Sequence, residues 1–337
     1  LAEAGLPEDD EPGRVTKYSA KGMMAKLYLY IKDYDNARIK ALEVINSGKY
    51  SLVGMANPDL YASMFNSSSF NNNAESLFSI QHQLTQDPWG SGNQKNPDRG
   101  PGNLQTDEAS MWEMYIPSMD MKAMYEDGDI RRPASMMEHG WSKVAWKPQR
   151  SGDPTYNEFM ASGYKYDTLL PTPRGILNPT RSNIAKYVVG PGSKYGGETV
   201  IGMNTGINLM ILRYADILLI YAEAVLGEQA STSDAQALQY FNLVRRRARV
   251  PEKTSITLDD IIHERRVEFA FEGDFWFDLQ RIGYDKAKEI IESQNRGTAE
   301  NPVYVTLNPE DLYLPIPVAE TLQDPELLKD PVPYYND

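Results

Sequence analysis

Small and apolar residues recur at helical spacing in residues 15–48. Ala25 and Leu29 share one face of a predicted helix, and Ala37 and Ala41 share one face of the next. Small residues at these positions let two antiparallel helices approach closely, as in a tetratricopeptide unit. The pattern therefore predicts a tetratricopeptide-like helix pair, with an ordinary helical hairpin as the alternative.

Helical spacing returns in residues 207–293. The first helix predicted there starts with the region and is apolar almost all round, which is typical of a helix packed between neighbours. Ser233 with Gln236, and Thr257 with Asp260, have the spacing of capping boxes that open two further helices. We expect a second tetratricopeptide-like pair here, together with one packing helix.

Residues 49–206 are rich in Asn, Ser, Gly, Pro and aromatic residues, and turn formers dominate 86–106 and 146–183. Long loops in a compact domain usually either carry function or are disordered, and the aromatic residues favour function. We therefore interpret this segment as the ligand face. A lead-in loop (1–14) and an irregular Pro-rich tail (294–337) complete one integrated, mainly α-helical domain of helical hairpins and long irregular loops.

Composition excludes several classes of function. The chain has 47 acidic and 34 basic residues, a net charge of −13, which disfavours binding to a phosphate backbone. It has no cysteine, so disulfides, thiolate metal sites and cysteine nucleophiles are excluded. No apolar run approaches the roughly 18 residues that a membrane-spanning helix needs. The 21 Tyr and 5 Trp residues exceed the 9 Phe, and Tyr and Trp rings suit both interfaces and sugar faces.

Motifs for metals and cofactors are incomplete. His263 and Glu264 begin a zinc-protease pattern, but Val267 stands where the second histidine is required. With three histidines and no cysteine, we expect neither a dedicated transition-metal site nor a cofactor. Calcium held by loop carboxylates such as Asp127 and Asp129 is the alternative.

Several blocks of sequence carry a family resemblance. They are residues 13–52, MKAMYEDGDIRRP (121–133), LRYADILLIYAEA, ERRVEFAFEGDFWFDL and LYLPIP. In this order they resemble the SusD/RagB family of glycan-binding outer-membrane lipoproteins. Phe275 departs from the pattern, because many members carry an arginine there, which puts one salt bridge of the signature in question.

The resemblance implies a surface-exposed lipoprotein of the cell outer membrane that serves polysaccharide utilization and nutrient uptake. Such a protein captures an oligosaccharide or polysaccharide and delivers it to a TonB-dependent, SusC-like transporter. The family's signal peptide, lipid-bearing cysteine and first helices are absent from this sequence, so we expect a fragment or a short member. Membrane association would then depend on a lipid anchor that this chain does not contain.

Charged residues interrupt the apolar helices of 207–293. They are Arg213, Asp216, Glu223, Glu264, Arg265, Arg266, Glu268 and Glu272. Paired carboxylates can hydrolyse glycosides, so an all-α glycoside hydrolase is one interpretation. An unpaired buried charge is expensive, however, and we expect these residues to pair across packed helices. We assign no catalytic residue.

The candidate glycan site lies in the loops, where sugar faces could stack on rings and hydroxyls could meet polar side chains. The candidates are Trp89, Asn93, Asp98, Arg99, Trp112, Trp141, Trp146, Tyr156 and Tyr164. Among the tryptophans, we expect Trp89 and Trp146 to be exposed and Trp276 to be core. The alternative function is a tetratricopeptide-type docking scaffold without a carbohydrate site of its own.

Overall fold

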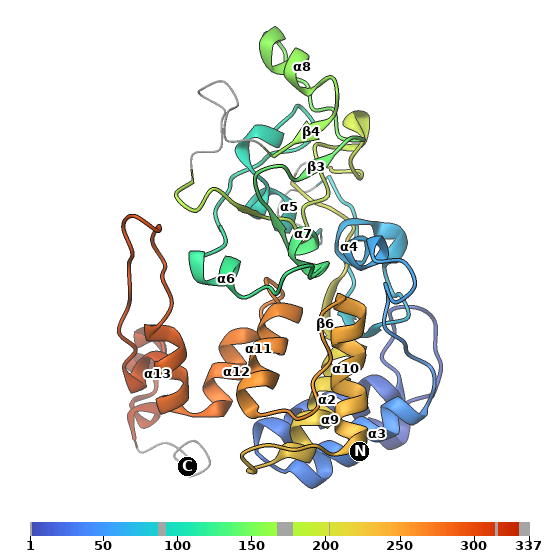
Figure 1. Ribbon diagram of the computed structural model, residues 1–337, viewed down its shortest axis with the longest axis vertical. Helices are drawn as coiled ribbons and strands as arrows, with labels where there is room; N and C mark the ends of the chain where they lie inside the picture. Colours follow the sequence, from blue (N-terminus) through green and yellow to red (C-terminus); the bar gives the residue numbers. More distant parts are fainter. Residues whose placement is uncertain (1, 87–91, 167–177, 202, 314–315, 330–337) are drawn as a thin grey trace.

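The computed structural model describes residues 2–86, 92–166, 178–201, 203–313 and 316–329. Within them helices dominate, and the strands form three two-stranded antiparallel sheets. Figure 1 shows the longer helices in the lower half and short elements with loops in the upper half. None of the described helices combines the length and apolar character needed to cross a membrane. The predicted mainly α-helical fold with long irregular segments is confirmed.

The lower half contains α1 (Ala2–Gly5), α2 (Lys17–Tyr30), α3 (Tyr34–Asn46), α9 (Tyr214–Leu226), α10 (Ala235–Ala248) and α11 (Leu258–Glu268). Helices α2 and α3 pack on each other, and α9 packs against both α3 and α10. Ala25, Ala37 and Ala41 are fully buried in this core. Small side chains therefore allow the close hairpin that the sequence predicts.

Helix α9 is buried on nearly all sides, as its apolar sequence predicts. Its start is not where the pattern placed it. Residues Leu209–Arg213 form strand β6, which pairs antiparallel with β1 (Ser76–Ile80), and the helix begins only at Tyr214. A short apolar run fits a strand as well as a buried helix, and pairing with β1 decides between them.

The two predicted helix starts differ in accuracy. Thr257 and Asp260 form the capping box of α11, as expected. In α10 the cap is Asp234, whose Oδ1 accepts the backbone N–H groups of Gln236 at 3.0 Å and Ala237 at 2.8 Å. The expected cap Ser233 is therefore wrong by one residue, because the adjacent carboxylate satisfies the same free N–H groups.

The upper half consists of short elements. They are α4 (Asp59–Asn66), α5 (Lys95–Arg99), α6 (Met119–Ala123), α7 (Arg131–Ser135), α8 (Pro154–Met160), and the paired strands β2 (Met136–Met137) with β5 (Asn183–Ile184) and β3 (Ser142–Lys143) with β4 (Tyr164–Lys165). Single 3₁₀ turns lie at Ser68–Phe70, Gly102–Leu104 and Ser193–Tyr195. Aromatic and apolar side chains from these elements form a second core, so the loop-rich segment folds around its own rings.

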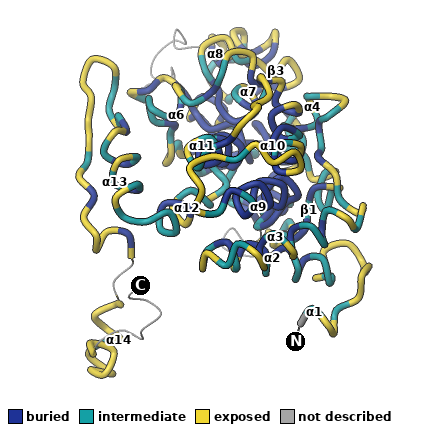
Figure 2. The backbone as a smooth tube through the Cα atoms, turned by 60° about the horizontal axis from the view of Figure 1, so that its bottom comes forward, coloured by how far each residue is buried: buried dark blue, intermediate teal, exposed yellow. Residues whose placement is uncertain are grey.

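A C-terminal arm begins with α12 (Phe275–Ile282) and α13 (Tyr284–Glu292) and includes α14 (Val318–Gln323). A small core of Leu279, Ala287, Ile291, Leu307 and Leu312 holds its first part together. Figure 2 shows buried residues concentrated in α9 and α11, whereas much of the arm is exposed. Beyond α13 the described arm has only α14 and the 3₁₀ turns Pro309–Leu312 and Pro325–Leu328, in keeping with its prolines.

Candidate functional site

A lattice of buried ion pairs joins the two halves, with Glu268 at its centre. The fully buried Glu268 carboxylate accepts hydrogen bonds from Arg213 at 2.6 Å, Arg131 at 3.1 Å and Arg247. Burial alone would raise the pKa of Glu268, but the charges of these arginines outweigh it and hold the pKa well below 4.5. Glu268 is therefore an ionised structural anchor.

A second group of buried charges joins α9, α11 and α12. Asp216 accepts hydrogen bonds from Arg265 at 2.5 Å and from Lys26 at 3.1 Å, and Arg265 also reaches Asp278 at 3.0 Å. Burial would raise the pKa of Asp216, yet the two cations hold it below 3.8. The remaining signature charges are paired as well: Glu223 with Arg281, Glu264 with Arg131 and Arg245, Arg266 with Asp120, and Glu272 with Lys186 and Arg213. The predicted pairing is confirmed.

Among the described residues, no cluster of three or more His, Cys, Asp or Glu has the geometry to hold a metal ion. Of the two calcium candidates, Asp129 forms an ion pair with Arg131 at 2.7 Å, and Asp127 is exposed.

Several predicted ligand residues lie inside the second core. The Trp146 side chain is only 4% exposed and packs on Trp141 and Tyr164, with ring centroids 5.6 and 6.1 Å apart. The expected exposure of Trp146 is wrong because Gly190 closes over it. An added Cβ at Gly190, which has φ +102°, would lie 2.5 Å from Trp146 Cε2. Trp141 is partly buried in the same cluster.

Two tyrosines predicted to meet ligand also belong to this core. The Tyr156 hydroxyl donates to the backbone carbonyl of Asn103, and the Tyr164 hydroxyl donates to the Asn103 side chain at 2.8 Å. Both rings are buried. The outer face of Tyr156 carries Arg150, whose guanidinium carbon is 4.2 Å from the ring centroid. These tyrosines hold the loops together.

The polar candidates near α5 are mostly structural. Asn93 is buried, donates to the carbonyl of Ile207 at 3.0 Å, and accepts the N–H of Lys95 at 2.9 Å. Arg99 is buried and donates to the carbonyls of Lys186 and Phe271. Trp89 lies outside the described residues.

Exposed apolar side chains gather instead on a short segment after α5. Trp112, Met114 and Tyr115 are 41, 60 and 57% exposed. The N–H of Trp112 donates to the carbonyl of Pro97 at 2.8 Å, and the N–H of Met114 donates to that of Asp98 at 2.8 Å. This segment, residues 112–115, is called the ledge below. Of the predicted ligand residues, Trp112 and Asp98 meet here.

Glu113 is the ledge residue whose side chain turns inward. In regular extended backbone, side chains alternate between faces. Glu113 has φ +51°, and its carboxylate turns inward to accept hydrogen bonds from Asn178 at 2.5 Å and Asn183 at 3.1 Å. Trp112, Met114 and Tyr115, in contrast, are open to solvent.

Two charged residues of α5, the helix whose carbonyl groups hold the ledge, are partly buried. Burial, together with the nearby Arg99 charge, lowers the pKa of Lys95 to about 8. Burial likewise raises the pKa of the half-buried Asp98. The start of the ledge is fixed by Met111, whose sulfur occupies the space where a Cβ of Gly100 would stand. Backbone hydrogen bonds and the packing of Met111 thus hold the ledge on a segment whose charged groups, Lys95 and Asp98, have shifted pKa values.

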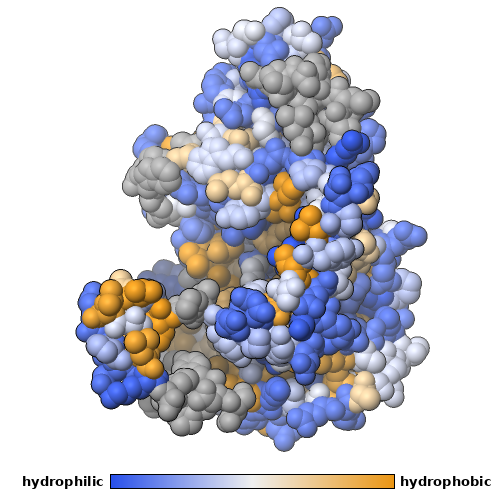
Figure 3. All heavy atoms as spheres, turned by 90° about the vertical axis from the view of Figure 1, so that its left-hand side faces the viewer, coloured by the Kyte–Doolittle hydropathy of each residue, from blue (hydrophilic) through white to orange (hydrophobic). Residues whose placement is uncertain are grey.

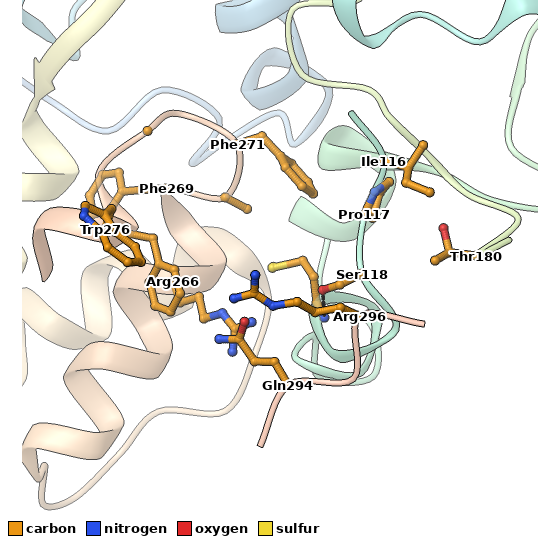
Figure 4. A pocket seen from close by; sticks show the side chains of 14 residues that line it. Ile116, Pro117, Ser118, Thr180, Arg266, Phe269, Phe271, Trp276, Gln294 and Arg296 are labelled. Carbon is orange, nitrogen blue, oxygen red and sulfur yellow. Dashed lines mark hydrogen bonds between the residues drawn. The ribbon is translucent and has the colours of Figure 1, made fainter. Parts of the chain in front are cut away.

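A pocket of about 490 Å³ begins where the ledge ends. Ile116 and Pro117 form one wall, and Phe271 and Trp276 line it from the loop after α11 and from α12. Trp276, expected to be core, is 38% exposed. Figure 3 shows apolar side chains within a recess on the corresponding face of the molecule, and Figure 4 shows the pocket from close by. Sequence reasoning missed this pocket because its walls come from four separate segments.

Comparison with known proteins gives one consistent result. The family model described as the SusD family matches residues 46–335. A SusD-like protein of Bacteroides ovatus is 31% identical, over 98% of this chain and 64% of its own length. SusD-like protein P2 of Formosa agariphila is 27% identical, over 79% of this chain and 50% of its own length. The chain thus spans half to about two thirds of these relatives.

Solved structures agree with these matches. A crystal structure with xylogluco-oligosaccharide superposes with a TM-score of 0.77 at 30% identity, over 99% of this chain and 70% of that one. A laminarin-binding SusD-like protein superposes with a TM-score of 0.61 at 26% identity, over 86% of this chain and 60% of that one.

Proposed function

This chain belongs to the SusD family, and on that premise we propose that it captures an oligosaccharide or polysaccharide at the cell surface. It would deliver the glycan to a TonB-dependent, SusC-like transporter of the outer membrane. Two of its structural neighbours are described with bound xylogluco-oligosaccharide or as laminarin-binding, which supports a glycan as the ligand.

The observation that carries the proposal is the ledge. Trp112 and Tyr115 are open to solvent, and their flat faces can stack on the C–H faces of a pyranose ring. Asp98, whose backbone carbonyl accepts the N–H of Met114, is half-buried and has a carboxylate that can accept hydrogen bonds from sugar hydroxyls. An open platform of this kind has few enclosing contacts, so we expect dissociation constants of about 1 μM to 1 mM.

Isothermal titration against a panel of neutral polysaccharides tests the ledge. Trp112→Ala and Tyr115→Ala should each weaken binding by about tenfold, equivalent to about 1.4 kcal/mol. Tyr304→Ala is the matched control, because Tyr304 is 59% exposed but lies on the C-terminal arm. Binding that neither ledge substitution changes would refute the ledge as the site.

A second function, a docking scaffold without its own carbohydrate site, is favoured by one observation. Met23, Leu27 and Ile31 form an exposed apolar stripe on α2 and its C-terminal cap, at a spacing of four residues. Such a stripe can receive the apolar face of a partner helix. The scaffold would be favoured over glycan capture if a transporter co-purified with this chain, the Leu27→Glu variant lost that co-purification, and the chain bound no glycan.

A further inference from the structure

We infer that the pocket next to the ledge binds a carboxylate-bearing sugar unit, a uronic acid, of the captured glycan. The inference rests on the proposed glycan binding and adds the chemical class of the ligand. Ledge and pocket are adjacent along the chain, because Tyr115 ends the first and Ile116 is the first lining residue of the second. A glycan lying along the ledge would therefore reach the pocket with its next units.

Two guanidinium groups supply the charge. Arg266 enters from α11 and Arg296 from the chain after α13, and Figure 4 shows both side chains directed into the same space. Arg266 is balanced by Asp120. Arg296 has no carboxylate within ion-pair distance among the residues that the structure describes. The pocket therefore carries a local positive charge on a chain whose net charge is −13.

A third donor points to a ligand more directly. Gln294 lines the same pocket, is only 6% exposed, and its Nε2 has no hydrogen-bond acceptor among the described residues. A buried amide without an acceptor is unfavourable unless a ligand supplies one. Together, Arg296 and Gln294 offer side-chain N–H donors for which the described part of the chain supplies no acceptor. An acceptor-rich, anionic group satisfies them.

The remaining walls fit a sugar ring. Trp276 and Phe271 present aromatic surface, and Ile116 with Pro117 forms the opposite apolar wall. The volume of about 490 Å³ lies within the range of small-molecule sites, roughly 300–1,000 Å³. A planar carboxylate matches the fork of a guanidinium, which favours a uronic acid over other anionic sugars.

Titration with length-matched oligosaccharides tests the inference. The wild-type chain should bind an oligouronide at least tenfold more tightly than its neutral counterpart, and the preference should shrink as salt is raised. Arg296→Gln should remove that preference, so that the ratio of the two dissociation constants falls to about one. Arg246→Gln is the matched control, because Arg246 is a half-exposed arginine that pairs with Glu252 away from the pocket.

The outcomes separate this inference from the proposed function. Neutral glycans that bind through Trp112, with no preference for the oligouronide or no effect of Arg296→Gln, would overturn the acidic subsite and leave glycan capture standing. A preference for a sulfated oligosaccharide but not for the oligouronide would also overturn the assignment to a carboxylate. Failure of neutral, sulfated and uronate ligands alike would overturn both proposals.

Discussion

Replacing Glu268 with Gln tests whether the buried signature charges are structural. The substitution keeps the shape of the side chain but removes the negative charge that Arg131, Arg213 and Arg247 share. It also turns an amide N–H toward arginine N–H groups, so donors face donors. Breaking a buried ion pair on one side costs about 3–5 kcal/mol.

The size of the thermal shift follows from chain length. An unfolding entropy of about 2.1 cal/mol/K per residue over 337 residues gives about 0.7 kcal/mol/K. A loss of about 3–5 kcal/mol should therefore lower Tm by about 4–7 °C. Glu252→Gln provides the control, since Glu252 pairs with Arg246 at 2.8 Å on the surface and such pairs contribute less than about 1 kcal/mol.

Differential scanning calorimetry at neutral pH measures both variants, and titration with glycan follows on the folded protein. We expect a lowered Tm for Glu268→Gln with unchanged glycan affinity, and a Tm within about 1.5 °C of wild type for Glu252→Gln. Equal Tm values for Glu268→Gln and wild type would refute the structural role. If the wild type turned over a glycan and the Glu268→Gln variant did not, the Glu268 carboxylate would instead have a catalytic role.

Three further results are expected. Neighbouring cations hold the pKa values of Asp216 and Glu268 below those of the unfolded chain. The stabilisation by these two carboxylates is therefore complete above about pH 4.5 and is lost as pH falls through the folded pKa values. Tm measured from about pH 7 to 3 should drop below about pH 4.5, and a flat profile would contradict this. Gly100→Ala should weaken glycan binding in titrations, because the added Cβ displaces the Met111 sulfur next to the ledge. Unchanged affinity would show that this packing does not support the binding site. Trp146→Ala should lower Tm by removing a buried ring, about 3–5 kcal/mol, without the selective loss of glycan affinity that a ligand-stacking ring would show.

The helices were predictable because their signals are local. Ala37 and Ala41 lie one turn apart, and Thr257 with Asp260 defines a helix start within four residues. The strand Leu209–Arg213 was not predictable from local signals, because it forms only by pairing with β1, which lies more than a hundred residues earlier. Sequence pattern reports what a segment can form, and a distant partner decides between the options.

The proposed glycan site was harder to predict, because the type of ring does not determine whether it is exposed. Trp112 and Trp146 both lie in the loop-rich segment 49–206, yet one is open and the other is covered. The backbone differs at the two places: Glu113, next to Trp112, has a positive φ and an inward side chain, and Gly190 approaches the Trp146 ring where any Cβ would collide. Loop composition therefore identifies a region that can bind sugar. Exposure within that region depends on the few positions where the backbone leaves its usual conformations.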